Sequence, residues 1–270
     1  MGTSPPPTPP PRMPEYDERR FKAITTPCEW IEDYHPGGYH PVHFGDVFKD
    51  GQYKVNRKLG EGSFSTVWLA FDQKFHRYVA LKIAVASMSK TSNELMILQR
   101  LAAATSTKVK PVTELLDKFD HEGPNGVHLC LVFEPMGPSV NSMVEELPCF
   151  NPFYSHMKIR YPFWMAKRIL RQALQGLEFL HRNGIAHGDF QPGNMLFTLQ
   201  DLNHIGDDKL QQDENYKFGS KSPPVERLDG KVDKWAPKYL AVPQPLAELA
   251  DISHNFTIKL SDMGGGKHTP

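Results

Sequence analysis

The sequence predicts an α+β fold with a β-rich first half and a helical second half. Short runs rich in β-branched and aromatic residues occupy Tyr53–Leu59, Thr66–Phe71 and Tyr78–Ile83, separated by polar turns. Runs of this kind at close spacing are typical of an antiparallel meander. In the second half, residues 163–182 carry apolar side chains at a period of 3.6, which predicts a long amphipathic helix.

One further helix and one buried strand are predicted in the first half. Leu95, Leu98 and Leu101 have helical spacing, which predicts a helix over Thr91–Leu101. The continuous apolar run Val127–Phe133 predicts a buried strand. The first half is therefore expected to be a sheet with one helix.

The long helix of the second half has a predicted apolar face and a predicted end. Asn183-Gly184 follows its last periodic residue, and glycine is common just after a helix. Thr257–Leu260 predicts a short strand near the end of the chain. The helix residues expected to face the core are Ala166, Ile169, Leu170, Ala173, Leu174, Leu177 and Leu180.

Composition excludes several classes of protein. The 270 residues include 31 basic and 31 acidic side chains, so no net field attracts nucleic acid or an anionic membrane. No apolar run is long enough to span a bilayer. Cys28, Cys130 and Cys149 are too few and too scattered for a disulfide framework, which favours a reducing compartment. We expect a monomer in the cytoplasm and nucleus, with no direct nucleic-acid or membrane partner.

Two stretches lack the pattern of a packed element. Seven of the first fourteen residues are proline, which favours an extended chain, and residues 1–20 are expected to be a disordered tail. Residues 198–256 are polar, contain several prolines and show no sustained periodicity. We interpret the second stretch as an insertion.

A glycine-bearing turn lies between the first two predicted strands. Leu59–Val67 reads Leu-Gly-Glu-Gly-Ser-Phe-Ser-Thr-Val and is therefore a hairpin. Gly60 and Gly62 would let backbone amides approach a triphosphate, and Phe64 could cover the phosphates. Hairpins also use glycine simply for positive φ, so the turn alone leaves both roles open.

A lysine stands near the end of the third predicted strand, in the run Val-Ala-Leu-Lys82. A lysine on a buried strand needs an anionic partner. Glu94 on the following helix is the natural counter-charge, and such a pair can hold the α- and β-phosphates of a nucleotide. Thr91 and Glu94 also fit a capping box, in which Glu94 only returns to the start of its helix. Both roles of Glu94 stay open.

The most specific motif follows the long helix. His187–Asn194 reads His-Gly-Asp-Phe-Gln-Pro-Gly-Asn and is predicted to be a loop. In this arrangement Asp189 can accept a hydroxyl proton while the amide oxygen of Asn194 binds a metal ion. Asp262 supplies a second hard ligand for Mg²⁺.

In this order the motifs resemble the eukaryotic protein kinase family, with Asp262-Met-Gly264 as a DFG-like triplet. The stretches Gly37–Asp46 and Phe64–Trp68, together with the position of the insertion, resemble the serine/arginine-rich protein kinases, particularly the fungal members. The resemblance implies the two-lobed kinase fold. It implies a lead-in segment (residues 21–52), a β-rich N-lobe (53–136) and a helical, incomplete C-lobe (137–270) with the insertion at 198–256.

The resemblance also implies a chemistry. Asp189 is the catalytic base, Lys82 and Glu94 form a pair, and Asn194 and Asp262 bind Mg²⁺. The implied reaction is transfer of the γ-phosphoryl group of ATP to a serine or threonine of an Arg-Ser-rich protein, in the regulation of mRNA processing. The implied hinge is Phe133–Met136, with adenine bonded to the Glu134 carbonyl and the Met136 amide. The residues implied to bind ATP are Leu59, Gly60, Glu61, Gly62, Ser63, Phe64, Ser65, Val67, Ala80, Lys82, Glu134 and Met136.

Departures from the family pattern keep other functions open. Gly188 replaces the arginine usual before the catalytic aspartate, so a phosphorylated activation loop would lack its cationic partner. Gln191 replaces a lysine that neutralises the γ-phosphate, which favours a slow kinase or an ATP-binding scaffold without turnover. The loop also resembles the HGDxxxxN loop of aminoglycoside and choline kinases, which phosphorylate small alcohols. Because only eight residues follow Asp262, we expect the domain to be cut off, with reduced stability and doubtful activity.

Overall fold

The computed structural model describes residues 19–103, 110–147 and 160–268, which form two compact units. Unit 1 contains the described residues up to Thr91, together with Lys118–Leu131 and Gly206–Gln244. Unit 2 contains Ser92–Asp117, Val132–Ile205 and the described residues from Pro245 onward. Most of the predicted proline-rich tail, and Cys149, lie outside the described residues.

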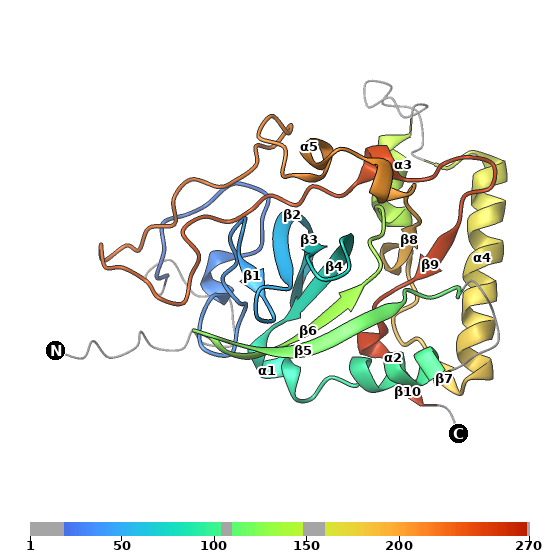
Figure 1. The fold of residues 1–270 in the computed structure, drawn as a ribbon, viewed down its shortest axis with the longest axis horizontal. Helices are drawn as coiled ribbons and strands as arrows, with labels where there is room; N and C mark the ends of the chain where they lie inside the picture. The colour runs from blue at the N-terminus through green and yellow to red at the C-terminus, as the bar shows by residue number, and fades with distance from the viewer. Residues whose placement is uncertain (1–18, 104–109, 148–159, 269–270) are drawn as a thin grey trace. The chain divides into compact units, whose positions relative to one another are not determined.

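A six-stranded sheet has the strand order β1-β2-β3-β4-β6-β5 (Figure 1). The predicted meander is confirmed, since β2 pairs antiparallel with β3, and β3 with β4. The first of these strands extends to Gly62 and so includes much of the predicted glycine turn. The strands are β1 (Val47–Phe48), β2 (Tyr53–Gly62), β3 (Ser65–Asp72), β4 (Arg77–Ala84), β5 (Leu115–Gly123) and β6 (Gly126–Phe133).

Strand β5 is an edge strand that the sequence does not predict. Its residues are half-buried or exposed, and charged side chains recur along it. Charged residues are a common protection of an edge strand, and they remove the apolar signal by which a strand is recognised in a sequence. Its partner β6 is buried from His128 to Phe133 and matches the predicted strand.

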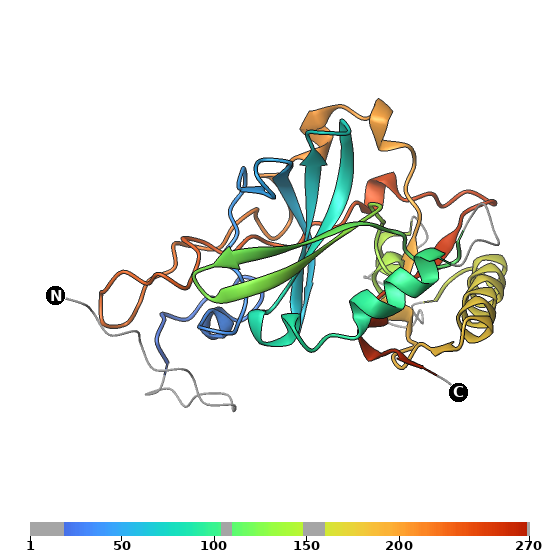
Figure 2. The same ribbon diagram turned by 60° about the horizontal axis from the view of Figure 1, so that its bottom comes forward.

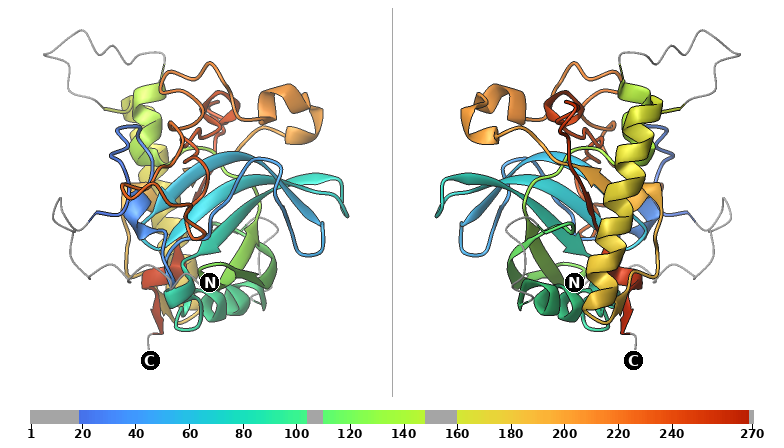
Figure 3. Two further views of the ribbon diagram at one scale, coloured as in Figure 1. Left: turned by 90° about the vertical axis from the view of Figure 1, so that its left-hand side faces the viewer. Right: turned by 90° about the vertical axis from the view of Figure 1, so that its right-hand side faces the viewer.

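The lead-in segment and part of the insertion pack together within unit 1 (Figure 3). Phe21, Tyr34 and Tyr39 form an apolar cluster with Val85, which follows β4, and with Leu240 of the insertion. Backbone hydrogen bonds of 2.9 Å join the amide of residue 22 to the carbonyl of residue 226, and the amide of residue 228 to the carbonyl of residue 20. The insertion is therefore ordered by contacts that are distant in sequence, which local periodicity does not reveal.

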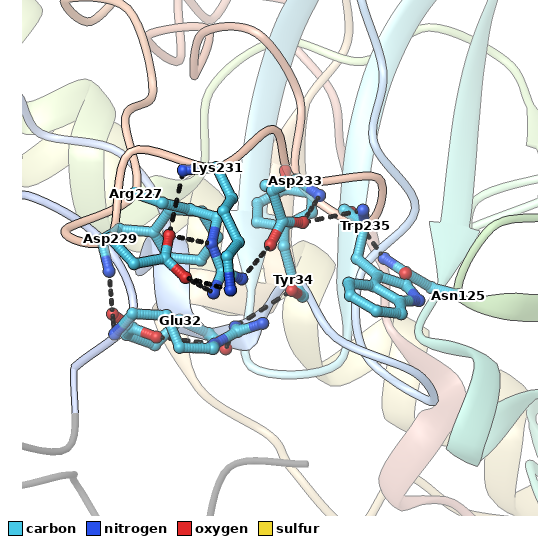
Figure 4. Close-up of polar contacts among 11 residues, drawn as sticks. Glu32, Tyr34, Asn125, Arg227, Asp229, Lys231, Asp233 and Trp235 are labelled. Carbon is cyan, nitrogen blue, oxygen red and sulfur yellow. Dashed lines mark hydrogen bonds and ion pairs between the residues drawn. The ribbon is translucent and has the colours of Figure 1, made fainter. Parts of the chain in front are cut away.

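Ion pairs also lie within each of these two segments (Figure 4). The guanidinium group of Arg227 binds Asp229 at 2.6 Å and Asp233 at 2.9 Å. On the lead-in segment, Arg20 Nε lies 3.0 Å from the buried Glu32 carboxylate. The side chains of Arg20, Glu32 and Asp233 are nearly inaccessible to solvent, whereas that of Asp229 is 38% exposed. Removing one partner of a buried pair would leave a buried charge without compensation.

Unit 2 is built around the long helix α4 (Phe163–Arg182), whose bounds match the predicted ones. Strand β9 (Ile258–Leu260) confirms the predicted final strand, pairs with β8 (Met195–Phe197) and packs against α4 (Figure 2). Strand β7 (Ile185–Ala186) pairs with β10 (Lys267–His268). The other helices are α1 (Ala86–Ser89) and α5 (Asp207–Leu210) in unit 1, α2 (Glu94–Ala103) and α3 (Val140–Glu146) in unit 2, and short 3₁₀ turns at Ile31–Asp33, Pro192–Asn194, Leu202–His204, Ala247–Leu249 and Met263–Gly265.

The predicted apolar face of α4 is partly wrong. Leu170 and Leu174 are each 63% exposed, whereas the face that packs in unit 2 is formed by Met165, Ile169, Ala173, Gly176 and Leu180. The reason lies at Gly176, where an added Cβ would lie only 2.7 Å from Leu260 of β9. The face of α4 that contains Gly176 therefore packs closely against β9. The periodicity of large apolar residues does not identify this face, because glycine has no apolar side chain. The helix ends as predicted at Asn183-Gly184, with Gly184 at a φ of +67°.

None of the helices among the described residues is long and apolar enough to cross a membrane.

Three histidines meet beside the sheet in unit 1. The His40 ring lies 4.6 Å from that of His121 in β5 and 4.9 Å from that of His128 in β6. Burial and the neighbouring histidines lower the pKa of His40 to about 3, although Asp46 acts in the opposite direction. Burial also lowers the pKa values of His121 and His128. The cluster is therefore neutral at pH 7.

We expect the cluster to make unit 1 sensitive to acid. Below the ordinary histidine pKa of 6.5, the unfolded chain binds protons that the folded cluster does not bind. The free energy of unfolding therefore falls as the pH falls from 6.5 toward 3. The loss for His40 alone is about 2 kcal/mol at pH 5. Urea denaturation of wild type and His40→Gln at pH 7.5 and 5.0 measures this, and the variant should lose less stability on acidification. His204→Gln, at an exposed histidine, is the control, and an equal pH dependence in all three proteins would contradict the expectation.

Candidate nucleotide-binding and phosphoryl-transfer site

The glycine turn joins β2 and β3 in unit 1. Glu61 pairs with Thr66 and Gly62 with Ser65, which leaves Ser63 and Phe64 at the tip. The Phe64 side chain is 61% exposed, while its carbonyl accepts a 2.9 Å hydrogen bond from the Val85 amide. The tip is thus held at its backbone and presents an unpacked aromatic ring.

Neither glycine of the turn is required by the protein's own structure. Gly60 and Gly62 have no positive φ, and an added Cβ at either residue would meet no atom of the described chain within 4 Å. Glycine in a hairpin usually supplies positive φ or makes room for a neighbour. Since both reasons are absent here, the missing Cβ atoms leave the backbone open to a molecule that approaches from outside.

Three of the predicted nucleotide-site residues share one face of the sheet. Lys82 of β4 is directly opposite Val67 of β3, and Ala80 precedes Lys82 by two residues on the same strand. Successive strand residues alternate between faces, so these side chains project from the same face. Lys82 is half-buried between two fully buried neighbours.

Glu94 is the first residue of α2 and is buried. Its amide donates to the hydroxyl of Ser92 at 3.2 Å, whereas the hydroxyl of Thr91 contacts the Met88 carbonyl at 3.4 Å. The capping contact at this helix start therefore comes from Ser92, and Thr91 does not fill the capping role considered above. Lys82 belongs to unit 1 and Glu94 to unit 2, so their pairing stays a prediction.

The predicted hinge residue Glu134 is fixed by its side chain in unit 2. Its two carboxylate oxygens lie 2.6 and 2.7 Å from Nζ of Lys259, which the sequence did not single out. The same carboxylate accepts a 2.9 Å hydrogen bond from the Glu114 amide. Among the described residues, the Met136 amide has no hydrogen-bond partner. A fixed Glu134 beside an unused Met136 amide is the arrangement that adenine recognition at this segment needs.

The loop after α4 brings Asp189, Gln191 and Asn194 together in unit 2. Gln191 Nε2 donates to both carboxylate oxygens of Asp189 at 3.0 and 2.9 Å. Asn194 Nδ2 donates to the carbonyl and to Oδ2 of Asp189 at 2.9 and 2.7 Å. The carboxylate is thereby oriented by neutral donors, and Asn194 keeps its amide oxygen for a metal ion.

His187 connects this loop to the segment that carries Asp262. The ring is buried, and its Nδ1 accepts the Asp189 amide at 3.3 Å, which leaves Nε2 to donate to the Ser261 carbonyl at 3.1 Å. The Ser261 amide in turn donates to the Asn194 carbonyl at 2.9 Å. Both predicted Mg²⁺ ligands therefore belong to one hydrogen-bonded assembly in unit 2. The sequence marks His187 only as part of the motif and gives no sign of this linking role.

Asp262 has a strained backbone for a residue with a side chain. Its φ of 57° and ψ of 81° lie in the left-handed region, and its carboxylate accepts the Gly264 amide at 3.2 Å. Strain of this kind concentrates at functional sites. The carboxylate of Asp262 and the amide oxygen of Asn194 are hard oxygen donors that suit Mg²⁺.

A family model described as Protein kinase domain matches residues 53–210. The chain belongs to the protein kinase family. The match covers both the glycine turn and the Asp189–Asn194 loop, so it favours protein kinases over the small-alcohol kinases whose loop is similar.

Relatives narrow the family further. This kinase-family chain is 36% identical to serine/threonine-protein kinase SKY1 of Saccharomyces cerevisiae over 231 residues, which are 80% of this chain and 30% of the relative. It is 42% identical to protein kinase dsk1 of Schizosaccharomyces pombe over 68% of this chain and 34% of that protein. It is 38% identical to SRSF protein kinase 3 of Homo sapiens over 63% of this chain and 29% of that protein. The resemblance to the serine/arginine-rich protein kinases is confirmed, and the chain spans about a third of the length of these three relatives.

A solved structure supports the fold. The crystal structure of the kinase domain PF14_0431 aligns with a TM-score of 0.54 and 20% identity, covering 85% of this chain and 55% of that one. The predicted α+β kinase fold is therefore confirmed.

Proposed function

We propose that the chain binds Mg²⁺ and ATP and is part of a serine/threonine protein kinase that phosphorylates Arg-Ser-rich proteins. Its substrates would act in mRNA processing, and the kinase would work as a monomer in the cytoplasm and nucleus. The proposal of a splicing-factor substrate draws on relatives that are named for SRSF proteins.

The observation that carries the proposal is the unrestrained glycine pair of the turn. Gly60 and Gly62 lack Cβ atoms at positions where the protein itself would accept them. Backbone amides freed of Cβ atoms are a common means of binding phosphates. The turn therefore binds the triphosphate, with Lys82 neutralising part of its charge.

The loop after α4 and the segment that carries Asp262 supply the groups for proton transfer and Mg²⁺ binding. Asp189, oriented by Gln191 and Asn194, accepts the proton of the attacking hydroxyl group. Asn194 and Asp262 hold Mg²⁺, which neutralises negative charge on the phosphates when it is bound. His187 holds the loop that carries Asn194 and the segment that carries Asp262 in a fixed relative position, because its ring bonds both the Asp189 amide and the Ser261 carbonyl.

Gly62→Ala tests nucleotide binding directly. Because Gly62 has an ordinary φ and open space, alanine should leave the free energy of unfolding unchanged or raise it by up to about 1 kcal/mol. The added methyl group should nevertheless weaken binding of Mg²⁺-ATP about tenfold, because it meets the phosphates. Titration with a fluorescent ATP analogue and nucleotide-induced thermal stabilisation measure the affinity.

Gly51→Ala is the matched control. Gly51 has a φ of +88°, so alanine there should lower stability while leaving nucleotide affinity intact. The proposal fails if wild type binds no nucleotide, or if Gly62→Ala binds as tightly as wild type.

Gln191 supports a second candidate function, an ATP-binding scaffold with little turnover. Its neutral amide bonds Asp189 at a position where an ammonium group would also stabilise charge on the γ-phosphate. Assays with labelled ATP, Mg²⁺ and an Arg-Ser peptide, choline or an aminoglycoside separate the alternatives. Transfer to the peptide supports the protein kinase, transfer to a small alcohol supports the other kinase class, and binding without transfer supports the scaffold.

A further inference from the structure

Lys58 carries a buried ammonium group at the base of the glycine turn. Its side chain is 0% exposed, and its Nζ binds the carboxylates of both Glu29 and Glu61. It also donates to the Ala241 carbonyl at 3.1 Å and lies 5.9 Å from the centre of the Trp68 ring. Three parts of the chain thus meet at one cation: the lead-in segment through Glu29, the turn through Glu61, and the insertion through Ala241.

The insertion also fixes the backbone of Lys58. The Lys58 amide donates to Gln212 Oε1 at 3.1 Å, and the Lys58 carbonyl accepts the Gln244 amide at 2.8 Å. The pairing of β2 with β3 shifts register between Lys58 and Gly60. A bulge of this kind bends a strand and redirects a side chain. Lys58 is therefore held from both sides at the point where the strand becomes the turn.

A second contact joins the lead-in segment to the turn. The Tyr39 hydroxyl donates to the Gly62 carbonyl at 2.7 Å, and the Tyr39 ring is buried in the apolar cluster of the lead-in segment. The Tyr34 hydroxyl donates to Glu29, so the carboxylate that holds Lys58 is itself held. The lead-in segment consequently holds the turn directly at Gly62 and, through Lys58, at Glu61.

The charge of Glu61 makes this arrangement more than structural. A free carboxylate in a phosphate-binding turn would repel a triphosphate. Here the Glu61 side chain is only 25% exposed and is paired with Lys58. Burial and the nearby Glu29 raise the pKa of Glu61 to about 7, against the opposing effect of Lys58, which agrees with a carboxylate withdrawn from water.

We propose that Tyr39, Glu29 and Lys58 are positioning residues for nucleotide binding. They hold the glycine turn in one conformation and keep the Glu61 carboxylate bound to Lys58 instead of facing the phosphates. The inference rests on the proposed function for its effect on nucleotide affinity. Its mechanical part, the restraint of residues 60–64 by the lead-in segment, is independent of any ligand.

Tyr39→Phe removes the hydroxyl and little else. The variant should expose the amides of residues 60–64 to faster hydrogen exchange and should raise the dissociation constant of Mg²⁺-ATP about fivefold, the equivalent of one net hydrogen bond. In a chain with measurable transfer, KM for ATP should rise while kcat stays constant.

Tyr78→Phe is the matched control. Tyr78 is also a buried tyrosine of unit 1, and its hydroxyl donates to Asp207 at 2.7 Å. Its loss should lower stability to a similar extent without changing hydrogen exchange in the turn or nucleotide affinity. A merely structural role for Tyr39 predicts equal behaviour of the two variants.

The double variant Glu29→Gln/Lys58→Gln tests whether Lys58 keeps the Glu61 carboxylate away from the phosphates. It removes one negative and one positive charge, keeps side chains of comparable size, and leaves Glu61 without its ammonium partner. Faster exchange in the turn and a larger loss of affinity than in Tyr39→Phe are expected. If this variant does not fold, Tyr39→Phe still decides.

The outcomes are distinguishable. Unchanged exchange at residues 60–64 in Tyr39→Phe overturns the positioning role whatever the ligand data show. Faster exchange with unchanged affinity overturns the effect on nucleotide binding. Faster exchange in a chain whose wild type binds no nucleotide removes the proposed function but leaves the restraint of the turn established.

Discussion

Lys58→Met is expected to lower the free energy of unfolding by about 3–5 kcal/mol, the range for breaking a buried ion pair by removing one partner. The ammonium group has no access to solvent and is shared by Glu29 and Glu61. Methionine fills a similar volume but leaves two carboxylates close together without a cation. Urea denaturation at pH 7.5 measures the loss, which ranks among the largest that one substitution in unit 1 would produce.

The loss should shrink in acid. The pKa of Glu61 is already raised from 4.5 to about 7, so between these values the folded state binds a proton more tightly than the unfolded chain. Stability linked to this group therefore falls as the pH rises through that window. Since Lys58 lowers the pKa of Glu61, its removal enlarges the effect, and the deficit of Lys58→Met should be larger at pH 7.5 than at pH 5.0.

Lys54→Met is the control on the same strand. Lys54 is exposed, so its replacement should change the unfolding free energy by no more than about 0.5 kcal/mol. Equal stabilities of the two variants, or a deficit of Lys58→Met that is constant with pH, would show that the buried cation is not balanced by these carboxylates.

Features set by local pattern were predictable from the sequence. The strands β2, β3 and β4 alternate or run continuously with apolar residues, and α4 has both a helical period and an Asn-Gly stop. The motif residues Asp189 and Asn194 are likewise local, because they lie on one short loop and bond directly. Each of these signals is contained in a single short run of consecutive residues, the scale on which periodicity acts.

Features set by distant contacts were not predictable. Lys58 reads as one more polar residue of a strand, and only the fold brings Glu29 and Ala241 to it. Lys259 lies in a buried strand, and it pairs with Glu134, 125 residues away, although Asp262 is much nearer in sequence. The insertion has no period because its order comes from the lead-in segment, with Phe21 paired to Arg227. The buried charge pairs at these places follow from the tertiary structure and not from local sequence patterns.

In the sequence, Gly188 is a departure from the family pattern, and its backbone explains the departure. Its φ is +79°, and an added Cβ would lie 1.9 Å from the carbonyl oxygen of Gly265. The arginine usual before the catalytic aspartate would meet the same collision as any other side chain. In this chain glycine is therefore required at the position, because the loop and the segment after Asp262 approach each other at backbone distance.

Gly188→Ala is consequently expected to reduce phosphoryl transfer about 100-fold, the effect of misplacing a catalytic group by about 1 Å. The left-handed φ alone should lower stability by about 1–2 kcal/mol. Relief of the collision must then move either Asp189 or the segment that carries Asp262, so the proposed proton acceptor and the proposed metal ligand lose their relative placement. Transfer to an Arg-Ser peptide at saturating ATP measures the first effect, and urea denaturation measures the second.

Gly193→Ala supplies the control within the same loop. Its added Cβ would make an ordinary contact of 3.9 Å with the Gln191 side chain, and its φ is not positive. Transfer by this variant should stay within about threefold of wild type, because a substitution without a collision or strain leaves the loop in place. If Gly188→Ala is as active as Gly193→Ala, the close approach of Gly188 and Gly265 does not position Asp189, and His187 with Ser261 must hold the loop alone.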